Sequence, residues 1–88
     1  MRQDNPSPYQ TSDTSFASYL LYHDHKVVGM KQDPSDVKRL VYVFIEKDDT
    51  QEVSKEFYYG EPNCDPRKFF KCSKEIFKVL RTHKEKMQ

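Results

Sequence analysis

The sequence predicts a small two-layer α+β domain, in which an antiparallel β-hairpin or a three-stranded sheet is packed by two to three helices, the last of them long. Three observations lead to this class. The chain has 88 residues, which suits one domain. A β-forming run over residues 37–46 lies between segments whose apolar residues recur at helical spacing. Aromatic residues make up 14% of the chain, and disordered sequences are poor in them.

The chain opens with a polar segment, residues 1–11, that we expect to be a flexible tail. It contains Pro6 and Pro8 and has no apolar core. Tyr9 is the residue whose ring would order part of this tail by packing on the body of the protein. Residues 12–88 are then expected to form a single α+β domain.

Local patterns place the remaining elements. Ser12 and Asp13 are good N-caps, and Pro66 suits the first position of a helix. The residues Asp-Pro-Ser-Asp at 33–36 favour a turn that joins two strands into an antiparallel hairpin. We therefore expect helices over about 14–22, 51–59 and 66–84 or 66–86, and strands over 26–31 and 37–46. A third strand at 57–59 is the competing interpretation of the second helix.

The run over residues 37–46 carries apolar side chains on both of its faces. Val41, Val43 and Ile45 share one face, which we expect to point into the core. Tyr42 and Phe44 share the other face, which is either covered by a helix or exposed as an aromatic surface. We favour the covered face, because the terminal helices need a sheet to pack on. The predicted core comprises Phe16, Leu20, Val41, Val43, Ile45, Phe57, Phe69, Ile76 and Leu80.

A formal charge of +1 conceals a separation of charge along the chain. From Cys64 onward there are eight Lys and Arg residues against three Asp and Glu residues, a local charge of +5. The preceding part of the chain carries −4. The expected C-terminal helix is therefore strongly basic, and the rest of the protein is acidic.

Five basic residues of this helix recur at spacings of 4, 3, 4 and 3. At about 100° per residue, they fall within an arc of roughly 80°. Two phenylalanines, seven residues apart, lie beside this arc. Cationic side chains flanked by aromatic rings suit contact with phosphates and stacking on bases or sugars. The predicted nucleic-acid-binding residues are Arg67, Lys71, Lys74, Lys78 and Arg81, which we call the basic ridge, with Phe70 and Phe77.

Other interpretations of the same features stay open. An amphipathic helix must present polar residues to water, so the ridge also fits a solvated helix face. A basic ridge also attracts an acidic protein. The many Tyr and Phe residues exceed what so small a core can bury, which favours a protein-interaction module. Under this alternative the predicted interface residues are Tyr42, Tyr58 and Tyr59.

The sequence predicts no enzyme, no metal site and no cofactor. The residues with soft metal-ligand chemistry lack the close pairs that are typical of zinc sites. They are His23, His25, Cys64, Cys72 and His83. We expect Cys72 to be buried and the histidines to be exposed. Neither a Gly-rich phosphate loop nor a nucleophile motif is present.

A series of short motifs occurs in a characteristic order. The series is Ser12-Asp13 before a helix with Ala17, Tyr19, Leu20 and Leu21, then Tyr42-Val43-Phe44-Ile45-Glu46, Phe57-Tyr58-Tyr59-Gly60 and Asp65-Pro66-Arg67-Lys68-Phe69. With these motifs, residues 11 to about 80 resemble a family of small phage and bacterial proteins classed as a domain of unknown function. That family's pattern usually has a glycine after the first helix, where His23-Asp24-His25 stands here. The resemblance implies a phage or mobile-element setting, nucleic acid or a host protein as the partner, and no catalytic motif.

These observations predict a non-enzymatic nucleic-acid-binding accessory protein of a phage or mobile element, which contacts phosphates through its basic C-terminal helix. The alternative is a protein-interaction module, such as a phage inhibitor of a host factor or a small homodimer. No apolar run approaches the roughly 18–20 residues that span a bilayer. Residues 1–10 also lack the features of a secretory signal. We therefore expect a cytoplasmic protein with no membrane partner.

Overall fold

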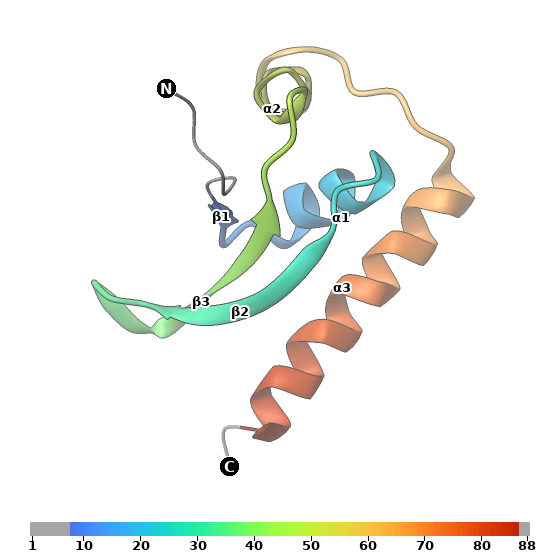
Figure 1. Cartoon of the computed structure of the whole chain (residues 1–88). Helices are drawn as coiled ribbons and strands as arrows, with labels where there is room; N and C mark the ends of the chain where they lie inside the picture. Colours follow the sequence, from blue (N-terminus) through green and yellow to red (C-terminus); the bar gives the residue numbers. More distant parts are fainter. Residues whose placement is uncertain (1–7, 87–88) are drawn as a thin grey trace.

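The computed structural model describes residues 8–86, apart from the side chain of Val37, and confirms the α+β class (Figure 1). Its elements are β1 (Pro8–Thr11), α1 (Thr14–Tyr22), β2 (Val27–Asp33), β3 (Asp36–Ile45), α2 (Thr50–Tyr59) and α3 (Pro66–Lys86). The strand order is β1-β3-β2, and both neighbouring pairs are antiparallel. The longest strand, β3, is therefore the central one, and β2 forms one edge of the sheet.

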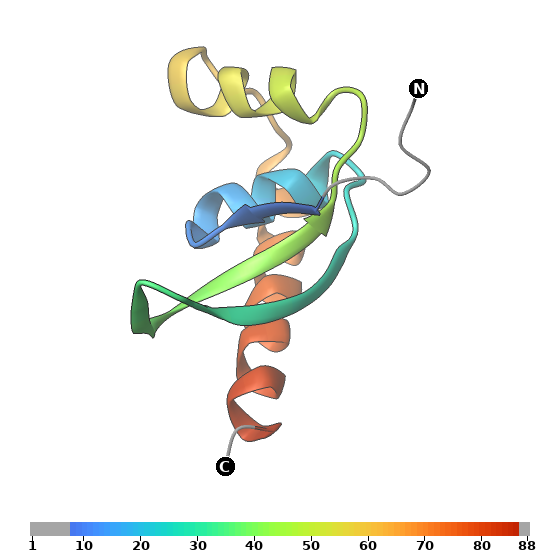
Figure 2. The same cartoon turned by 60° about the vertical axis from the view of Figure 1, so that its left-hand side comes forward.

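The helices gather on one side of the sheet and around its end (Figures 1 and 2). The short helix α1 contacts α2, α3 and β1, so it links the layers of the fold. The long helix α3 packs chiefly on α1 and also touches the edge strand β2. Most of one face of α3 is consequently left to solvent.

The predicted helices and the predicted hairpin are confirmed. The residues 57–59 continue α2, so the competing interpretation of this segment as a strand is wrong. The hairpin turn lies at Pro34-Ser35, between the paired residues Asp33 and Asp36. The Asp33 carboxylate accepts hydrogen bonds from the backbone N–H and the hydroxyl of Ser35, at 2.9 and 2.8 Å. These bonds stabilise the ionised form and lower the pKa of Asp33.

The third strand comes from a segment that the sequence analysis assigned to the flexible tail. Residues 8–11 form β1 and pair with β3, from Pro8 opposite Ile45 to Thr11 opposite Tyr42. The ring of Tyr9 packs edge-on against that of Phe16, with centroids 6.0 Å apart. Residues 8–11 are short and polar, so their own sequence shows no alternating apolar pattern that would predict a strand. They form a strand because they pair with β3, more than thirty residues further along the chain. Residues 1–7 of the expected tail lie outside the described part of the chain.

The face of β3 that points into the core is the opposite of the predicted one. Tyr42 and Phe44 are buried, with 2% and 0% of their surface exposed, whereas Ile45 is 40% exposed and Val43 is half-buried. Alternation defines two faces but does not say which one meets the helices. The face that carries Tyr42 and Phe44 is covered by the helices, which confirms the prediction that this face is covered and not exposed. Val41, which was predicted to lie in the core, is buried at 7% exposure.

The rest of the predicted core is confirmed in outline. Phe16, Leu20 and Ile76 are fully buried. Three further predicted residues are half-buried and pack against this cluster, namely Phe57, Phe69 and Leu80. Ala17, Tyr19 and Val53 are also buried, although they are not among the predicted core residues. Together, these side chains join α1, α2, α3 and β3 around one core.

The turn after α1 explains why the chain tolerates the absence of a glycine there. The N–H of His25 donates to the carbonyl of Leu20 at 3.0 Å, and that of Asp24 to Leu21 at 3.0 Å. This pair of bonds is the Schellman arrangement, which needs a left-handed residue at the position after the helix. Asp24 adopts that conformation, with φ at 66°. Aspartate accepts it at some cost, whereas glycine does so without a steric penalty.

We expect Asp24→Gly to raise the free energy of unfolding by about 0.5 kcal/mol, because it relieves the left-handed strain. The matched change Asp24→Val should lower it by roughly 1–2 kcal/mol, since a β-branched side chain fits this conformation poorly. Urea unfolding of the three proteins measures both effects. A glycine variant less stable than the valine variant would show that the turn is not built in this way.

Candidate nucleic-acid interface

The helix α3 begins where its sequence predicts. Pro66 is its first residue, and the Asp65 carboxylate before it accepts a 3.4 Å hydrogen bond from the backbone N–H of Lys68. Ile76, at 0% exposure, marks the face of α3 that turns toward the core. The five residues of the basic ridge, three and four apart, share one face of the helix, and at about 100° per residue Ile76 lies opposite the middle of that face. The basic ridge is therefore directed toward solvent.

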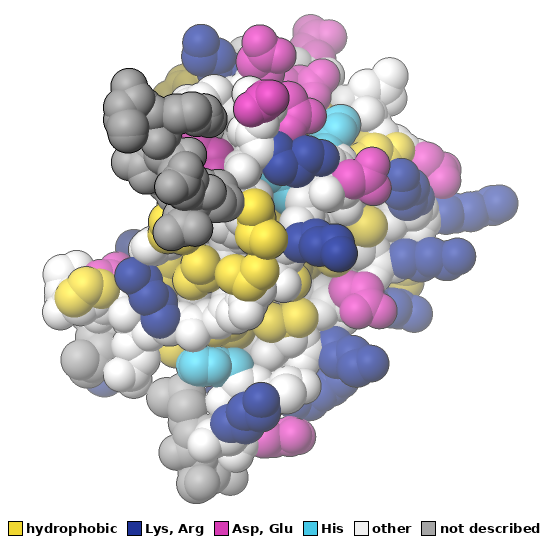
Figure 3. Space-filling view, viewed as in Figure 1, with side chains coloured by type: hydrophobic (Ala, Val, Ile, Leu, Met, Phe, Trp, Pro, Cys, Tyr) yellow, Lys and Arg dark blue, Asp and Glu magenta, His cyan; other side chains and the backbone are white. Residues whose placement is uncertain are grey.

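All five cations of the basic ridge are exposed. Among the described residues, none of them forms an ion pair with a carboxylate. In the space-filling view, Lys and Arg side chains project along the α3 side of the molecule, whereas Asp and Glu gather around α2 (Figure 3). In the described part of the chain, the ridge therefore presents cations with no carboxylate within ion-pair distance.

Aromatic rings lie exposed beside the ridge. Phe70 is 60% exposed and Phe77 is 53% exposed, although both are large apolar side chains. The ammonium group of Lys74 lies over the ring of Phe70, 4.8 Å from its centroid. This cation–π contact holds a positive charge next to an accessible aromatic face. The predicted combination of cations and stacking rings is thus present on one helix surface.

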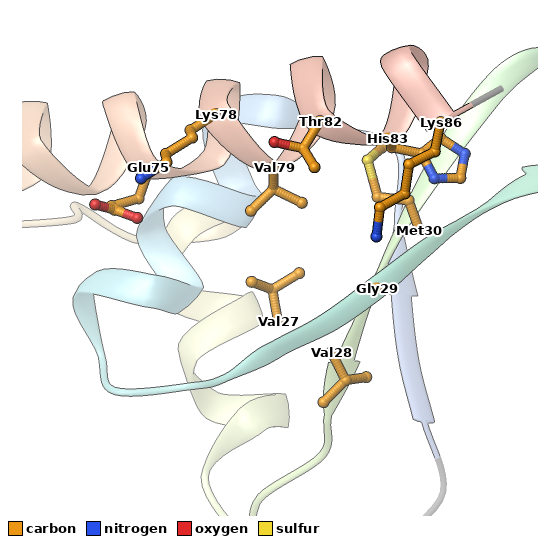
Figure 4. A pocket seen from close by; sticks show the side chains of 10 residues that line it. All are labelled: Val27, Val28, Gly29, Met30, Glu75, Lys78, Val79, Thr82, His83 and Lys86. Atoms are coloured by element: carbon orange, nitrogen blue, oxygen red, sulfur yellow. The ribbon is translucent and has the colours of Figure 1, made fainter. Parts of the chain in front are cut away.

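A groove of about 390 Å³ runs along the other flank of the ridge, between α3 and the edge strand β2 (Figure 4). Val27 and Val79 face each other across it, and Val28 points away from α3. Lys78 and Lys86 line the groove on its α3 side, so one residue of the ridge belongs to the groove as well. This groove arises from the meeting of two elements nearly fifty residues apart, and nothing in the sequence pattern indicates it.

The three tyrosines of the alternative interface are not equivalent. Tyr42 is 2% exposed, so its ring is not available to a protein partner, and its assignment to a protein interface is corrected. Tyr58 is 47% exposed, and its hydroxyl donates a 2.8 Å hydrogen bond to the Asp13 carboxylate. Tyr59 is 89% exposed. Of the three, Tyr59 is the residue most available to a partner.

Burial and the hydrogen bond to Asp13 together raise the pKa of Tyr58 to about 12. A raised pKa means that the folded state favours the neutral hydroxyl, whose unfolded pKa is about 10. The hydroxyl therefore contributes its stabilisation fully below pH ~10 and loses it as the pH rises toward ~12. Tyr58→Phe should lower the free energy of unfolding by about 1 kcal/mol at neutral pH. The difference between variant and wild type should shrink above pH ~10, and a constant difference would contradict this assignment.

The predicted exposure of the histidines is wrong: His25 is 1% exposed, and His23 and His83 are half-buried. The Nδ1 of His25 lies 3.1 Å from the carbonyl of His23, which can only accept, so Nδ1 carries the proton. Its Nε2 lies 2.9 Å from the hydroxyl of Thr50 and 3.7 Å from the Asp49 carboxylate. The same hydroxyl accepts from the backbone N–H of Lys47 at 2.8 Å, so His25 serves to join the start of α2 to the end of α1. This buried histidine is a structural residue.

The cysteines are free thiols, and both are half-buried. Burial raises the pKa of Cys72, which keeps this thiol protonated near neutral pH. Within residues 8–86, no group of three His, Cys, Asp or Glu side chains is arranged to hold a metal ion.

Comparisons with known proteins were made at three levels, and no family model, curated protein or solved structure matches the chain. The resemblance noted from the sequence motifs therefore stays a prediction. In the described part of the chain, no helix is both long enough and apolar enough to cross a membrane.

Proposed function

We propose that the protein is a non-enzymatic nucleic-acid-binding accessory protein, and that a phage or mobile element is its setting. The single observation that carries the proposal is the exposed basic ridge, whose five cations have no carboxylate partners among the described residues. Unpaired cations along a helix attract phosphates and release counterions when phosphates bind. A solvated helix face would more commonly mix both signs of charge.

The exposed rings favour single-stranded nucleic acid over a duplex. Phe70 and Phe77 are two helical turns apart, so their rings are separated by about 10 Å along α3. Bases of a single strand can leave their own stack and lie on such rings, whereas paired bases cannot. The cations of the ridge then hold the adjacent phosphates.

The experiment is a fluorescence-anisotropy titration of labelled single- and double-stranded oligonucleotides of equal length at low salt. We expect tighter binding to the single strand, and a loss of roughly tenfold or more in affinity for it in Phe70→Ala and in Phe77→Ala. Tyr59→Ala is the matched control, because it removes an aromatic ring that is 89% exposed but lies on α2. The absence of binding to either oligonucleotide at low salt would refute the proposal.

The exposure of Tyr59 also favours a second candidate, a protein-interaction module. This residue lies in the acidic part of the molecule, so the acidic end of one copy could meet the basic ridge of another in a homodimer. Size-exclusion chromatography with light scattering would then show a dimer that Tyr59→Ala disrupts. A monomer at all concentrations, retaining only nuclease-sensitive partners from a lysate, would rule this candidate out.

A further inference from the structure

A second basic feature lies where three distant segments meet. The N-terminus of α1, the first half of β3 and the last turns of α3 enclose a pocket of about 310 Å³. This volume is at the lower end of the range of ~300–1,000 Å³ that small-ligand sites occupy. Lys38 and Arg39 line it from β3, and Lys84 lines it from α3. We call it the basic pocket.

In the described part of the chain, the basic pocket has no acidic residue in its lining, although Arg39 acts at longer range on Asp33, whose pKa it helps to lower. Among the described residues, the side chains of Lys38, Arg39 and Lys84 make no ion pair. Asp36, two residues before Lys38, accepts a hydrogen bond from the backbone N–H of Lys38 at 3.1 Å. Asp13, next to the lining residues Ser12 and Thr14, is also engaged elsewhere. One of its oxygens accepts from the backbone N–H of Phe16 at 3.2 Å, and the other accepts from the hydroxyl of Tyr58 at 2.8 Å.

The lining of the pocket also offers hydroxyl groups in a rigid setting. The hydroxyls of Thr14 and Tyr42 lie 3.0 Å apart, and Tyr42 is 2% exposed. Only one proton is used between two such hydroxyls, so the accepting hydroxyl keeps its own proton for another acceptor. Thr14 is also the first residue of α1, but the Asp13 carboxylate already caps this helix end, so the cations and hydroxyls are the groups left to bind an anion.

The basic pocket continues the surface of α3 that carries the exposed rings. Two aromatic and three cationic residues recur along this surface at spacings of 4, 3, 4 and 3, within an arc of roughly 80°. They are Phe70, Lys74, Phe77, Arg81 and Lys84. The last of them lines the pocket. A single strand that lies along these residues therefore reaches the pocket with one end.

We infer that the basic pocket binds a phosphate group, and that this phosphate is the terminal monoester of the strand bound along α3. This inference rests on the proposed function only for the source of the phosphate. A terminal monoester carries a charge of about −1.5 to −2 near neutral pH, whereas an internal diester carries a single charge. Three unpaired cations match the monoester better.

The first arm of the test needs no nucleic acid. Inorganic phosphate is titrated into the labelled protein at constant ionic strength, with chloride replaced, and amide shifts are followed by NMR. We expect saturable shifts at Thr14 and Tyr42, and binding at least tenfold weaker in the double variant Arg39→Gln with Lys84→Gln. The double variant Lys26→Gln with Lys55→Gln removes two exposed cations elsewhere and should bind phosphate as the wild type does. Shifts that never saturate, or that survive the pocket variant, overturn the inference.

The second arm identifies the source of the phosphate. Oligonucleotides of one sequence are compared with a 5′-phosphate, with a 3′-phosphate and with hydroxyl ends. We expect one terminal phosphate to tighten binding about tenfold, and the pocket variant to abolish this gain. Equal affinities for all three would overturn the assignment to a terminal phosphate.

The two arms separate the failure of this inference from the failure of the proposed function. If the protein does not bind oligonucleotides, the pocket still binds inorganic phosphate. If the pocket inference is wrong, oligonucleotides bind but inorganic phosphate leaves Thr14 and Tyr42 unchanged.

Discussion

Replacing Lys71, Lys74 and Lys78 together by Glu is expected to abolish detectable nucleic-acid binding. The change reverses three charges in the middle of the basic ridge, so phosphates would meet carboxylates where they now meet unpaired ammonium groups. We expect an affinity loss of at least ~100-fold at low salt, since each lost phosphate contact also removes the release of a counterion. Fluorescence anisotropy with a single-stranded oligonucleotide measures it.

A matched variant controls for net charge. Lys26, Lys31 and Lys55 are exposed and lie outside α3, and their replacement by Glu changes the formal charge of the protein by the same amount. We expect this variant to lose less than about tenfold, because only long-range attraction is weakened. Equal losses in the two variants would mean that net charge, and not the ridge, governs binding.

Two neighbouring residues of β3 should differ greatly in their contribution to stability. Phe44 is fully buried among the helices, whereas Ile45 is 40% exposed on the other face of the sheet. Phe44→Ala should cost roughly 3–5 kcal/mol through lost burial and a residual cavity. Ile45→Ala should cost about 1 kcal/mol, mainly through strand propensity. Urea unfolding measured by circular dichroism gives both values.

The larger change approaches the whole stability of a domain of this size, which is roughly 4–13 kcal/mol. The milder variant Phe44→Leu, expected to cost about 1–2 kcal/mol, keeps the comparison measurable if Phe44→Ala does not fold. If Ile45→Ala lowered the free energy of unfolding more than Phe44→Leu does, the core would lie on the face of β3 that carries Val43 and Ile45, and the assignment of the inward face would be wrong.

The parts of the fold that the sequence predicted correctly depend on neighbouring residues. The Asp13 cap and the following apolar spacing placed α1 at 14–22, and Pro66 placed the start of α3. The turn residues at 33–36 placed the hairpin. Each of these signals acts within a few residues, so a pattern in the chain is enough to find it.

The features that were missed depend on residues far apart in the chain. The strand β1 exists because Pro8–Thr11 pairs with the end of β3, and the inward face of β3 is decided by where the helices pack. The basic ridge could be predicted because its five residues lie in one helix, and their spacing of three and four residues is enough to place them on one face. The groove beside β2 and the basic pocket could not, because they combine β-strand residues with residues of α3.

The salt dependence of binding tests the central claim most directly. If the ridge contacts phosphates, a plot of log affinity against log salt concentration should be linear with a slope of about −2 to −4, since each single-strand phosphate contributes about −0.7. Lys71→Gln and Lys78→Gln should each make the slope shallower by about 0.7. A slope near zero, or one that neither substitution changes, would contradict the proposal that this ridge binds nucleic acid.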